Sequence, residues 1–311
     1  MELNQARVFV EPQQGMSYGQ LLAMARTAEA AGFGAFFRSD HYLKMGDVSG
    51  LPGPTDAWIT LAGLARDTER IRLGTLVTSA TFRLPGPLAI AVAQVDEMSG
   101  GRVELGLGAG WYQAEHEAYG IPFPALGERF DRLEEQLEVI TSLWAAPVGE
   151  TVDVSGTHYP VQGSPGLPKP AQSPRPPILI GGGGKRRTPM LAARFADEFN
   201  LPFGSTDSFA TQIERVNAAC RTIDRDPGEL CHSAALVACV GQTEAEFVER
   251  ARRIGRAPDE LRGAGICGLP DEVRAGIDRW TAAGADRIYF QLLDVDDLEH
   301  VALLAEIISA G

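Results

Sequence analysis

The feature that most constrains this chain is a repeated alternation of short apolar runs with longer segments of helical periodicity. Eight such units follow one another over 311 residues. Parallel strands need a crossover connection, usually a helix, so the alternation predicts βα units around a parallel sheet. Eight units predict one α/β domain, residues 1–311, folded as a single (β/α)8 TIM barrel. The predicted strands are Ala6–Val10, Ala35–Arg38, Ile71–Val77, Val103–Leu107, Pro177–Ile180, Glu198–Leu201, Ala234–Val240 and Arg287–Leu293.

The helical segments carry recognisable start signals. Ser17 with Gln20 three residues later forms a capping-box pattern, and Asp56 is a second N-cap candidate. Further helices are predicted over Glu128–Trp144 and Leu298–Ile308, where aliphatic residues recur at helical spacing. Each predicted strand is therefore followed by a helical segment, as a barrel requires.

Two segments exceed the simple repeat, and we expect them to be insertions at the barrel mouth. Residues 151–176 contain a predicted hairpin, Thr151–Val161, followed by a coil rich in glycine and proline. Residues 254–269 lie between the seventh and eighth predicted strands and contain four glycines. Long loops that follow barrel strands commonly surround the mouth.

Charge and cysteine content limit the partners of the chain. A formal net charge of -13 argues against a surface that holds nucleic acid or an anionic membrane. The four cysteines show no C-x-x-C spacing, so reduced thiols are expected rather than disulfides. No apolar run approaches the roughly 18 residues of a membrane span, and no secretory signal pattern is present. We therefore expect a cytoplasmic protein.

The candidate catalytic pair is Asp40 and His41, directly after the second predicted strand. In a parallel barrel the active site lies at the carboxyl ends of the strands. A carboxylate beside an imidazole at such an end can orient a ligand or exchange a proton with it. A structural histidine next to a helix-capping aspartate explains the same pair equally well.

Four glycines, Gly181–Gly184, follow the fifth predicted strand and precede Lys185, Arg186 and Arg187. Backbone amides can approach a ligand closely there, and a helix expected to begin near Arg187 or Thr188 adds the positive end of its dipole. These features predict a phosphate site. The loop is not a Walker motif, because Arg186 stands where serine or threonine is needed. A flexible turn is the plain alternative.

Two further glycine-rich stretches have weaker implications. Gly106–Gly110 misses the dinucleotide fingerprint, and it indicates either close backbone approach to a flat ligand or a tight turn. Gly15–Gly19 matches G-x-S-x-G, the nucleophile elbow of serine hydrolases. We reject a hydrolase, because the motif follows the first strand and Ser17 is already explained as a helix cap.

No metal site is predicted from the five histidines, which are scattered along the chain. None of them forms an H-x-x-x-H pattern. Glu115, His116 and Glu117 follow one another in a helical segment, and we interpret them as a solvated helix face.

Three stretches resemble the luciferase-like monooxygenase superfamily: Ser39–His41, Arg70–Thr78 and Gly101–Trp111. The resemblance spans essentially the whole chain. Within the superfamily, the glycine-rich junction after the fifth predicted strand and Tyr289–Asp294 are most similar to an actinobacterial branch predicted to use the deazaflavin coenzyme F420. The resemblance implies a luciferase-like barrel, an oxidoreductase activity and F420 as cofactor, with FMN as the alternative.

The resemblance also assigns roles to particular residues. A bulge with a non-prolyl cis peptide is implied at Leu76–Val77, behind the cofactor ring. Asp40 and His41 match the pair that touches ring and substrate, so His41 is the expected proton donor and Asp40 orients it or the ring. The positions implied to contact the cofactor are Asp40, Leu76, Val77, Ser79, Ala109, Gly110, Gly182, Gly183, Gly184, Lys185 and Arg186.

One position departs from the sugar-phosphate dehydrogenases of this superfamily. Trp111 stands where they have a glutamate that acts as acid or base, which makes a glucose-6-phosphate dehydrogenase doubtful. An apolar or aromatic acceptor stacked on Trp111 and Tyr112 is the expected substrate, although the two rings can equally be rim packing.

The resemblance leaves several properties open. The alternatives to hydride transfer are monooxygenation with reduced FMN supplied by a separate reductase, and a non-catalytic flavin-binding barrel. Relatives often form dimers, which implies a homodimer. The identity of the small-molecule substrate and the direction of hydride transfer do not follow from the sequence.

Overall fold

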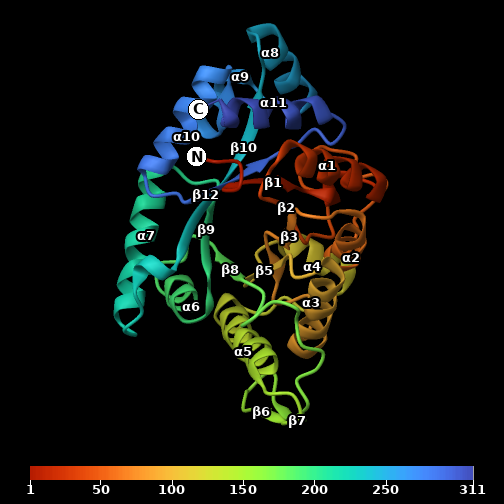
Figure 1. Ribbon diagram of the computed structural model, residues 1–311, viewed down its shortest axis with the longest axis vertical. Coiled ribbons are helices and arrows are strands. Elements are labelled where there is room, and N and C mark those ends of the chain that lie inside the picture. Colours follow the sequence, from red (N-terminus) through yellow and green to blue (C-terminus); the bar gives the residue numbers. More distant parts are fainter. Residues whose placement is uncertain (311) are drawn as a thin grey trace.

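The computed structural model describes residues 1–310, in which eight parallel strands close into a barrel (Figure 1). The ring closes because β10 pairs with β9 on one side and with β12 on the other. A two-residue strand, β4 (Thr78–Ser79), continues the line of β3 against β5. The barrel strands are β1 (Ala6–Val10), β2 (Ala35–Arg38), β3 (Arg72–Thr75), β5 (Val103–Gly108), β8 (Ile178–Gly181), β9 (Glu198–Pro202), β10 (Cys231–Val240) and β12 (Arg287–Gln291).

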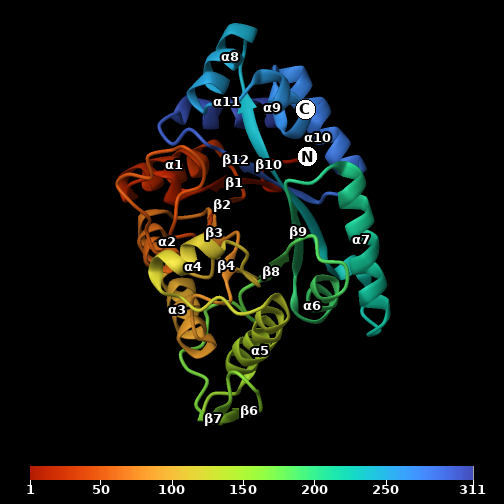
Figure 2. The same cartoon turned by 180° about the vertical axis from the view of Figure 1, so that it is seen from behind.

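Helices surround the barrel on the outside in both views (Figures 1 and 2). The predicted (β/α)8 TIM barrel is confirmed, with more helices than the eight that the repeat requires. Two 3-10 turns, Pro12–Gln14 and Pro227–Glu229, complete the helical segments of residues 1–310. The helices are α1 (Tyr18–Ala31), α2 (Ala57–Asp67), α3 (Pro85–Ser99), α4 (Gln113–Tyr119), α5 (Leu126–Ala145), α6 (Arg187–Phe195), α7 (Thr206–Arg221), α8 (Glu244–Arg253), α9 (Pro258–Ala264), α10 (Pro270–Ala282) and α11 (Leu298–Ser309).

The predicted helix starts are confirmed at both capping positions. The Ser17 side chain accepts a hydrogen bond from the Gln20 backbone N–H, and the Ser17 backbone N–H donates to the Gln20 side chain. The Asp56 carboxylate accepts from the backbone N–H groups of Trp58 and Ile59 at the start of α2. Each contact satisfies backbone donors that the first helical turn leaves without an intrahelical partner.

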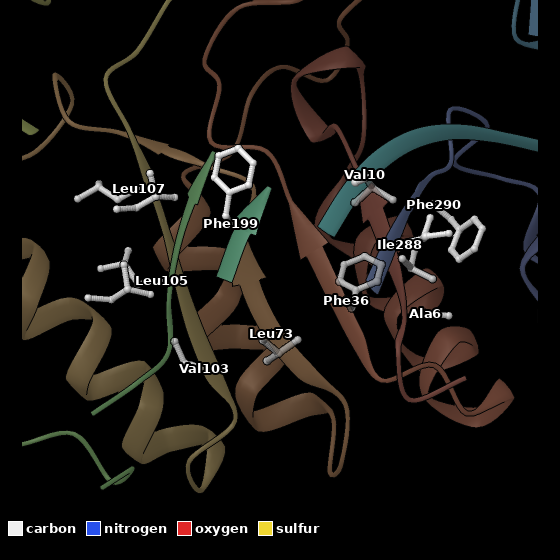
Figure 3. Close-up of a cluster of buried hydrophobic side chains, with 14 of the residues drawn as sticks. Ala6, Val10, Phe36, Leu73, Val103, Leu105, Leu107, Phe199, Ile288 and Phe290 are labelled. Atoms are coloured by element: carbon white, nitrogen blue, oxygen red, sulfur yellow. The ribbon is translucent and has the colours of Figure 1, made fainter. Parts of the chain in front are cut away.

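The main core lies between the outer face of the barrel and the helices. Successive side chains of a strand point to opposite faces, so Ala6 and Val10 of β1 face outward. They belong to the same core cluster as Phe36 of β2, Leu73 of β3 and Leu105 of β5. Figure 3 shows these side chains on several barrel strands, and with the other buried apolar residues they form one cluster. Both faces of every barrel strand are covered, which explains the nearly unbroken apolar runs in the sequence.

The inside of the barrel has a charged layer and an apolar layer. Near the amino ends of the strands, Arg7 lies 3.1 Å from Glu104 across the barrel, and the Tyr289 hydroxyl donates to Glu198. An apolar cluster fills the rest of the interior, and its members Phe9, Ala235, Leu76 and Val77 line the mouth cavity. The whole cluster consists of Phe9, Ala35, Phe37, Leu179, Ala235 and Tyr289, with Leu76 and Val77 packed against it.

The first insertion is a hairpin, as predicted, and it lies along α5. β6 (Val152–Val154) pairs with β7 (Val161–Ser164), and Figures 1 and 2 both show the hairpin projecting beyond α5, away from α8. The coil that follows returns to the amino ends of the strands, where Gln172 bonds to the Val103 carbonyl. The insertion follows α5 and precedes β8, so it leads to the amino end of the next strand, opposite the barrel mouth. None of residues 151–176 lines the cavity at the mouth.

The second insertion extends a strand rather than the mouth. Within it, β11 (Ile266–Gly268) pairs with the last three residues of β10, beyond the part of β10 that pairs with β12. None of residues 254–269 lines the mouth cavity. Among residues 1–310, no helix is long and apolar enough to cross a membrane.

Candidate active site at the barrel mouth

A cavity of about 420 Å³ opens at the carboxyl ends of the barrel strands. Every barrel strand except β12 contributes to it, through its last residues, through the loop that follows or, for β10, through Ala235 in the middle of the strand. Helix α5 covers one side with Leu126, Phe130 and Leu133. The cavity is therefore mostly apolar, with a few polar groups at strand ends, which is the usual composition of a cofactor or substrate site.

A break in the third strand forms part of the cavity wall. The Leu76–Val77 peptide bond is cis, and it separates β3 from β4 at the position that the resemblance implied. Both side chains line the cavity. A Cβ atom on Gly106 would lie 1.9 Å from the Thr75 carbonyl oxygen, so this close approach of β5 to the bulge requires glycine. The predicted bulge is confirmed.

His41 lines the cavity and is held by a buried carboxylate. Its Nδ1 lies 2.9 Å from Oε1 of Glu115, and the Tyr42 backbone N–H donates to Oε2 of Glu115 at 3.0 Å. Glu115 is only 1% exposed and also lines the cavity. The interpretation of Glu115 and His116 as a solvated helix face is therefore wrong, because the face of α4 that carries them packs inward while Glu117 faces solvent.

Asp40 lies behind the cavity and does not line it. Its carboxylate forms an ion pair with Arg83 at 2.5 Å and accepts a hydrogen bond from the Thr78 hydroxyl at 2.8 Å. Burial alone would lower the pKa of Arg83, but the nearby Asp40 carboxylate raises that pKa above its usual value. The predicted role of Asp40 at the ring and beside His41 is corrected accordingly: Glu115 makes the contact with His41.

A second carboxyl group, Glu11, faces the cavity from the end of β1. Its oxygens accept hydrogen bonds from the side-chain amides of Gln13 and Gln291. Burial raises the pKa of Glu11, against the opposing effects of His41 and of the two amides. The cavity thus contains two carboxyl groups, and no lysine or arginine of residues 1–310 lines it.

The glycine loop lies at the cavity as predicted, but the cations that follow it do not line the cavity. Gly182, Gly183 and Gly184 line the cavity, and α6 begins at Arg187 directly after the loop. Lys185 and Arg186 are exposed outside the lining, and within residues 1–310 neither forms an ion pair.

Arg187 does not join these two cations. Its guanidinium contacts Asp131 at 2.6 Å and Glu134 at 3.2 Å on α5. The predicted cluster of three cations is therefore reduced to Lys185 and Arg186.

Trp111 stands at the entrance of the cavity. It is 65% exposed, lies 5.8 Å from His41 between ring centroids, and stacks on Tyr112 at 5.1 Å. Tyr112 does not line the cavity, since its hydroxyl donates to the Lys44 carbonyl and its ring supports Trp111. Of the two predicted substrate contacts, the structure brings only Trp111 to the cavity.

Ser79, Ala109 and Gly110 line the cavity at the positions expected for cofactor contacts. Sequence reasoning missed other lining residues, because their elements are distant in the chain. Among them are Glu11, Glu115, Asn200, Phe203 and the three α5 residues. A search of every strand exit for carboxylates would have found Glu11, but no local signal identifies Glu115.

A larger depression of about 600 Å³ lies between α5 and the hairpin, away from the strand ends. It is lined by Asp131, Glu134, Glu135 and Glu138. Three of these carboxylates pair with Arg187 or Arg194 on α6. Glu135 accepts backbone N–H groups of the hairpin. These contacts join α5 to its neighbours and account for the acidic residues without a ligand.

The fold and the site define a parallel α/β barrel with a mostly apolar cavity, a bulged third strand and a glycine loop at its mouth. A sequence profile described as luciferase-like monooxygenase matches residues 3–272. The chain belongs to the luciferase-like monooxygenase family.

Individual relatives carry more specific names. An F420-dependent glucose-6-phosphate dehydrogenase of Microbacterium testaceum is 36% identical over 195 residues, which cover 62% of this chain and 55% of that protein. An F420-dependent hydroxymycolic acid dehydrogenase of Mycobacterium tuberculosis is 32% identical over 227 residues, covering 73% of this chain and 60% of that protein. The match thus spans little more than half the length of these curated relatives.

Solved structures extend the fold comparison to the whole chain. An F420-dependent secondary alcohol dehydrogenase, solved with an F420–acetone adduct, superposes with a TM-score of 0.85 at 19% identity, covering 100% of this chain and 99% of that one. The coenzyme F420-dependent tetrahydromethanopterin reductase of Methanopyrus kandleri gives 0.81 at 19% identity, with the same coverage. At this identity the superpositions establish the fold alone.

Proposed function

We propose that this protein is an oxidoreductase that transfers a hydride between coenzyme F420 and an uncharged organic substrate. The observation that carries the proposal is the pair formed by His41 and Glu115 on the wall of an otherwise apolar cavity, between the strand bulge and the glycine loop. The relatives named for F420 support the choice of cofactor.

The residues of the mouth suit a flat ring with an anionic tail. A Cβ atom on Gly182 would meet no atom within 4 Å, and one on Gly183 would meet only Leu201 at 4.0 Å, so the loop leaves open space toward the cavity. The α6 N-terminus adjoins the loop, and Lys185 and Arg186 lie just outside.

The residues proposed to hold the coenzyme divide between ring and tail. Leu76, Val77, Ser79, Ala109 and Gly110 would hold the ring. Gly182, Gly183, Gly184, Lys185 and Arg186 would hold the tail. When bound, F420 supplies or accepts the hydride.

His41 would move the proton that accompanies the hydride. With its Nδ1–H donated to Glu115, the neutral imidazole keeps a lone pair on Nε2 and can take a proton from an alcohol. The imidazolium, which the Glu115 carboxylate stabilises, can return that proton to a carbonyl oxygen. The same two residues thus serve either direction of hydride transfer, and Glu115 also fixes the ring orientation of His41.

The charges of the cavity favour a substrate without anionic groups. Glu11 and Glu115 line the cavity, and among residues 1–310 no cation lines it to offset them. A sugar phosphate would place its charge near these carboxylates without a guanidinium or ammonium partner, which costs several kcal/mol when such a charge is desolvated. The apolar side chains of Phe9, Phe130 and Phe203 suit an aliphatic or aromatic alcohol or carbonyl compound instead.

The assembly and location of the protein are proposed on separate grounds. Ile59 on α2 is 74% exposed, and Ile90 on the neighbouring α3 is also exposed, which supports burial of this face in a homodimer. The four cysteines are free, which supports a reducing, cytoplasmic location. Light scattering of the purified protein tests the dimer.

Turnover with F420 tests the proposed reaction. A panel of uncharged secondary alcohols and ketones is assayed beside glucose 6-phosphate, by following absorbance of the oxidised coenzyme. We expect turnover only with uncharged compounds and a loss of about 10²-fold or more in His41→Ala. Turnover of glucose 6-phosphate alone, or unchanged activity of His41→Ala, would contradict the proposal.

A further inference from the structure

A chain of three hydrogen-bonding side chains leads from the cavity into the protein. Ser79 Oγ lies 2.6 Å from Thr81 Oγ1, which lies 2.6 Å from Nε2 of His116. On the far side of the imidazole, Nδ1 lies 2.7 Å from the Tyr112 carbonyl oxygen. Ser79 lines the cavity, whereas His116 is completely buried between the rings of Phe82 and Phe123.

The direction of every hydrogen bond in this chain follows from its inner end. A carbonyl oxygen only accepts, so Nδ1 of His116 must donate to Tyr112. The completely buried ring hydrogen-bonds only to a hydroxyl and a carbonyl, and no carboxylate partner among residues 1–310 offsets a positive charge on it, so the imidazole is neutral and its Nε2 accepts from the Thr81 hydroxyl. Because Thr81 has one hydroxyl proton, its oxygen accepts from Ser79. The Ser79 proton thus points away from the cavity, and an oxygen lone pair remains for a ligand.

The backbone around Ser79 supports this arrangement. The Thr81 backbone N–H points at Ser79 Oγ at 3.4 Å, which is compatible with an accepting oxygen. A Cβ atom on Gly110 would lie 2.3 Å from Ser79 Oγ and 3.2 Å from Thr81 Oγ1. Glycine at 110, with its φ of +77°, therefore leaves room for the pair of hydroxyls.

We infer that Thr81 and His116 are positioning residues that hold Ser79 as a fixed hydrogen-bond acceptor for an N–H or O–H group of the bound ligand. This inference rests on the proposed function insofar as the ligand is F420, whose pyrimidinedione edge carries an N–H. A serine alone rotates its hydroxyl to donate or to accept. Here the buried imidazole removes that choice, so the cavity discriminates against a ligand that presents only an acceptor at this position.

A double-mutant cycle on coenzyme affinity tests the inference. Oxidised F420 is titrated into the wild type, Ser79→Ala, Thr81→Val and the double variant, with Thr81→Ser as the conservative control. We expect Ser79→Ala and Thr81→Val each to weaken F420 binding about five- to tenfold, and the double variant to bind no more weakly than Ser79→Ala. Thr81→Ser keeps the hydroxyl and should bind F420 with wild-type affinity. Unchanged affinity in Thr81→Val, or effects that multiply in the double variant, would overturn the inference.

A spectroscopic measurement on the ligand-free protein keeps this test separate from the cofactor assignment. Nitrogen-15 NMR at pH 7 should show the His116 ring as the neutral Nδ1–H tautomer, with the Nε2 resonance displaced in Thr81→Val. An Nε2–H tautomer or an imidazolium would overturn the inference. If the wild type binds no F420 but the Nδ1–H tautomer is observed, the proposed cofactor fails and the acceptor role of Ser79 stands.

Discussion

At the scale of single residues, the contact between Glu115 and His41 carries the proposed chemistry. Replacing Glu115 by glutamine keeps an acceptor for the Nδ1–H group but removes the charge that stabilises the imidazolium. We expect kcat to fall about 10²-fold or more in Glu115→Gln, while F420 affinity stays within about threefold of the wild type.

The matched control for this variant is Glu117→Gln, because Glu117 lies on the same helix but faces solvent. Steady-state kinetics and coenzyme titration of both variants provide the measurement. A loss of activity equal in the two variants would indicate damage to α4 instead of a role for Glu115.

The sequence identified His41 but paired it with the wrong carboxylate. Asp40 and His41 are adjacent, yet consecutive side chains of an extended segment point in opposite directions, so Asp40 turns to Arg83 while His41 turns to the cavity. Glu115 comes from a helix 74 residues further along the chain. Local patterns do not reveal such a contact, because it exists only when α4 packs across the end of β2.

At the scale of elements, the loop before α6 provides a test of anion binding. We expect Lys185→Ala combined with Arg186→Ala to weaken F420 binding by about 1 to 3 kcal/mol and to reduce its salt dependence, because charge-assisted contacts to the anionic tail are lost. Isothermal titration at two salt concentrations measures both effects.

Arg187→Ala is the control for this pair. Its guanidinium is engaged by Asp131 and Glu134, so its removal should leave F420 affinity unchanged. If the double variant binds as the wild type does at both salt concentrations, Lys185 and Arg186 are only part of a solvated surface.

The start of α1 allows a test of the rejected hydrolase. Ser17 completes a capping box, so Ser17→Ala should lower the free energy of unfolding by about 1 kcal/mol and leave turnover unchanged. Ser309→Ala, at an exposed position near the end of α11, should change neither quantity. Chemical denaturation and the F420 assay check these expectations, and abolished activity in a fully folded Ser17→Ala would revive the hydrolase.

Among the elements, strands were predicted more accurately than the insertions. β1 and β2 have the predicted bounds, because apolar runs between turn residues mark buried parallel strands. The predicted strand Ile71–Val77 is divided, since the bulge at Leu76–Val77 interrupts its pairing with β5. The course of residues 151–176 depends on contacts with α5 and Val103, which no local pattern contains.

At the scale of the whole molecule, a buried histidine ties stability to pH. His300 of α11 accepts a hydrogen bond from the Val240 backbone N–H through Nε2, so the native ring is neutral. Burial, followed by the nearby Arg250, lowers the pKa of His300 to about 4 from the ordinary 6.5. Between these values the unfolded chain binds a proton that the native protein does not bind.

We therefore expect His300 to reduce stability as the pH falls below about 6.5. Protonation of this histidine in the unfolded chain should lower the free energy of unfolding by on the order of 2 kcal/mol between pH 7 and pH 5. The His300 ring resonances in NMR should remain those of a neutral imidazole down to pH 5. A ring that protonates near pH 6.5 in the folded protein would contradict this expectation.

Equilibrium binding is the most direct test of whether the barrel mouth binds the deazaflavin coenzyme. Oxidised F420 and FMN are titrated separately into the wild-type protein under identical conditions. We expect tighter binding of F420, because its several carboxylates and phosphodiester gain more from Lys185 and Arg186 than one phosphate does. Saturable binding of FMN with no measurable binding of F420 would contradict it.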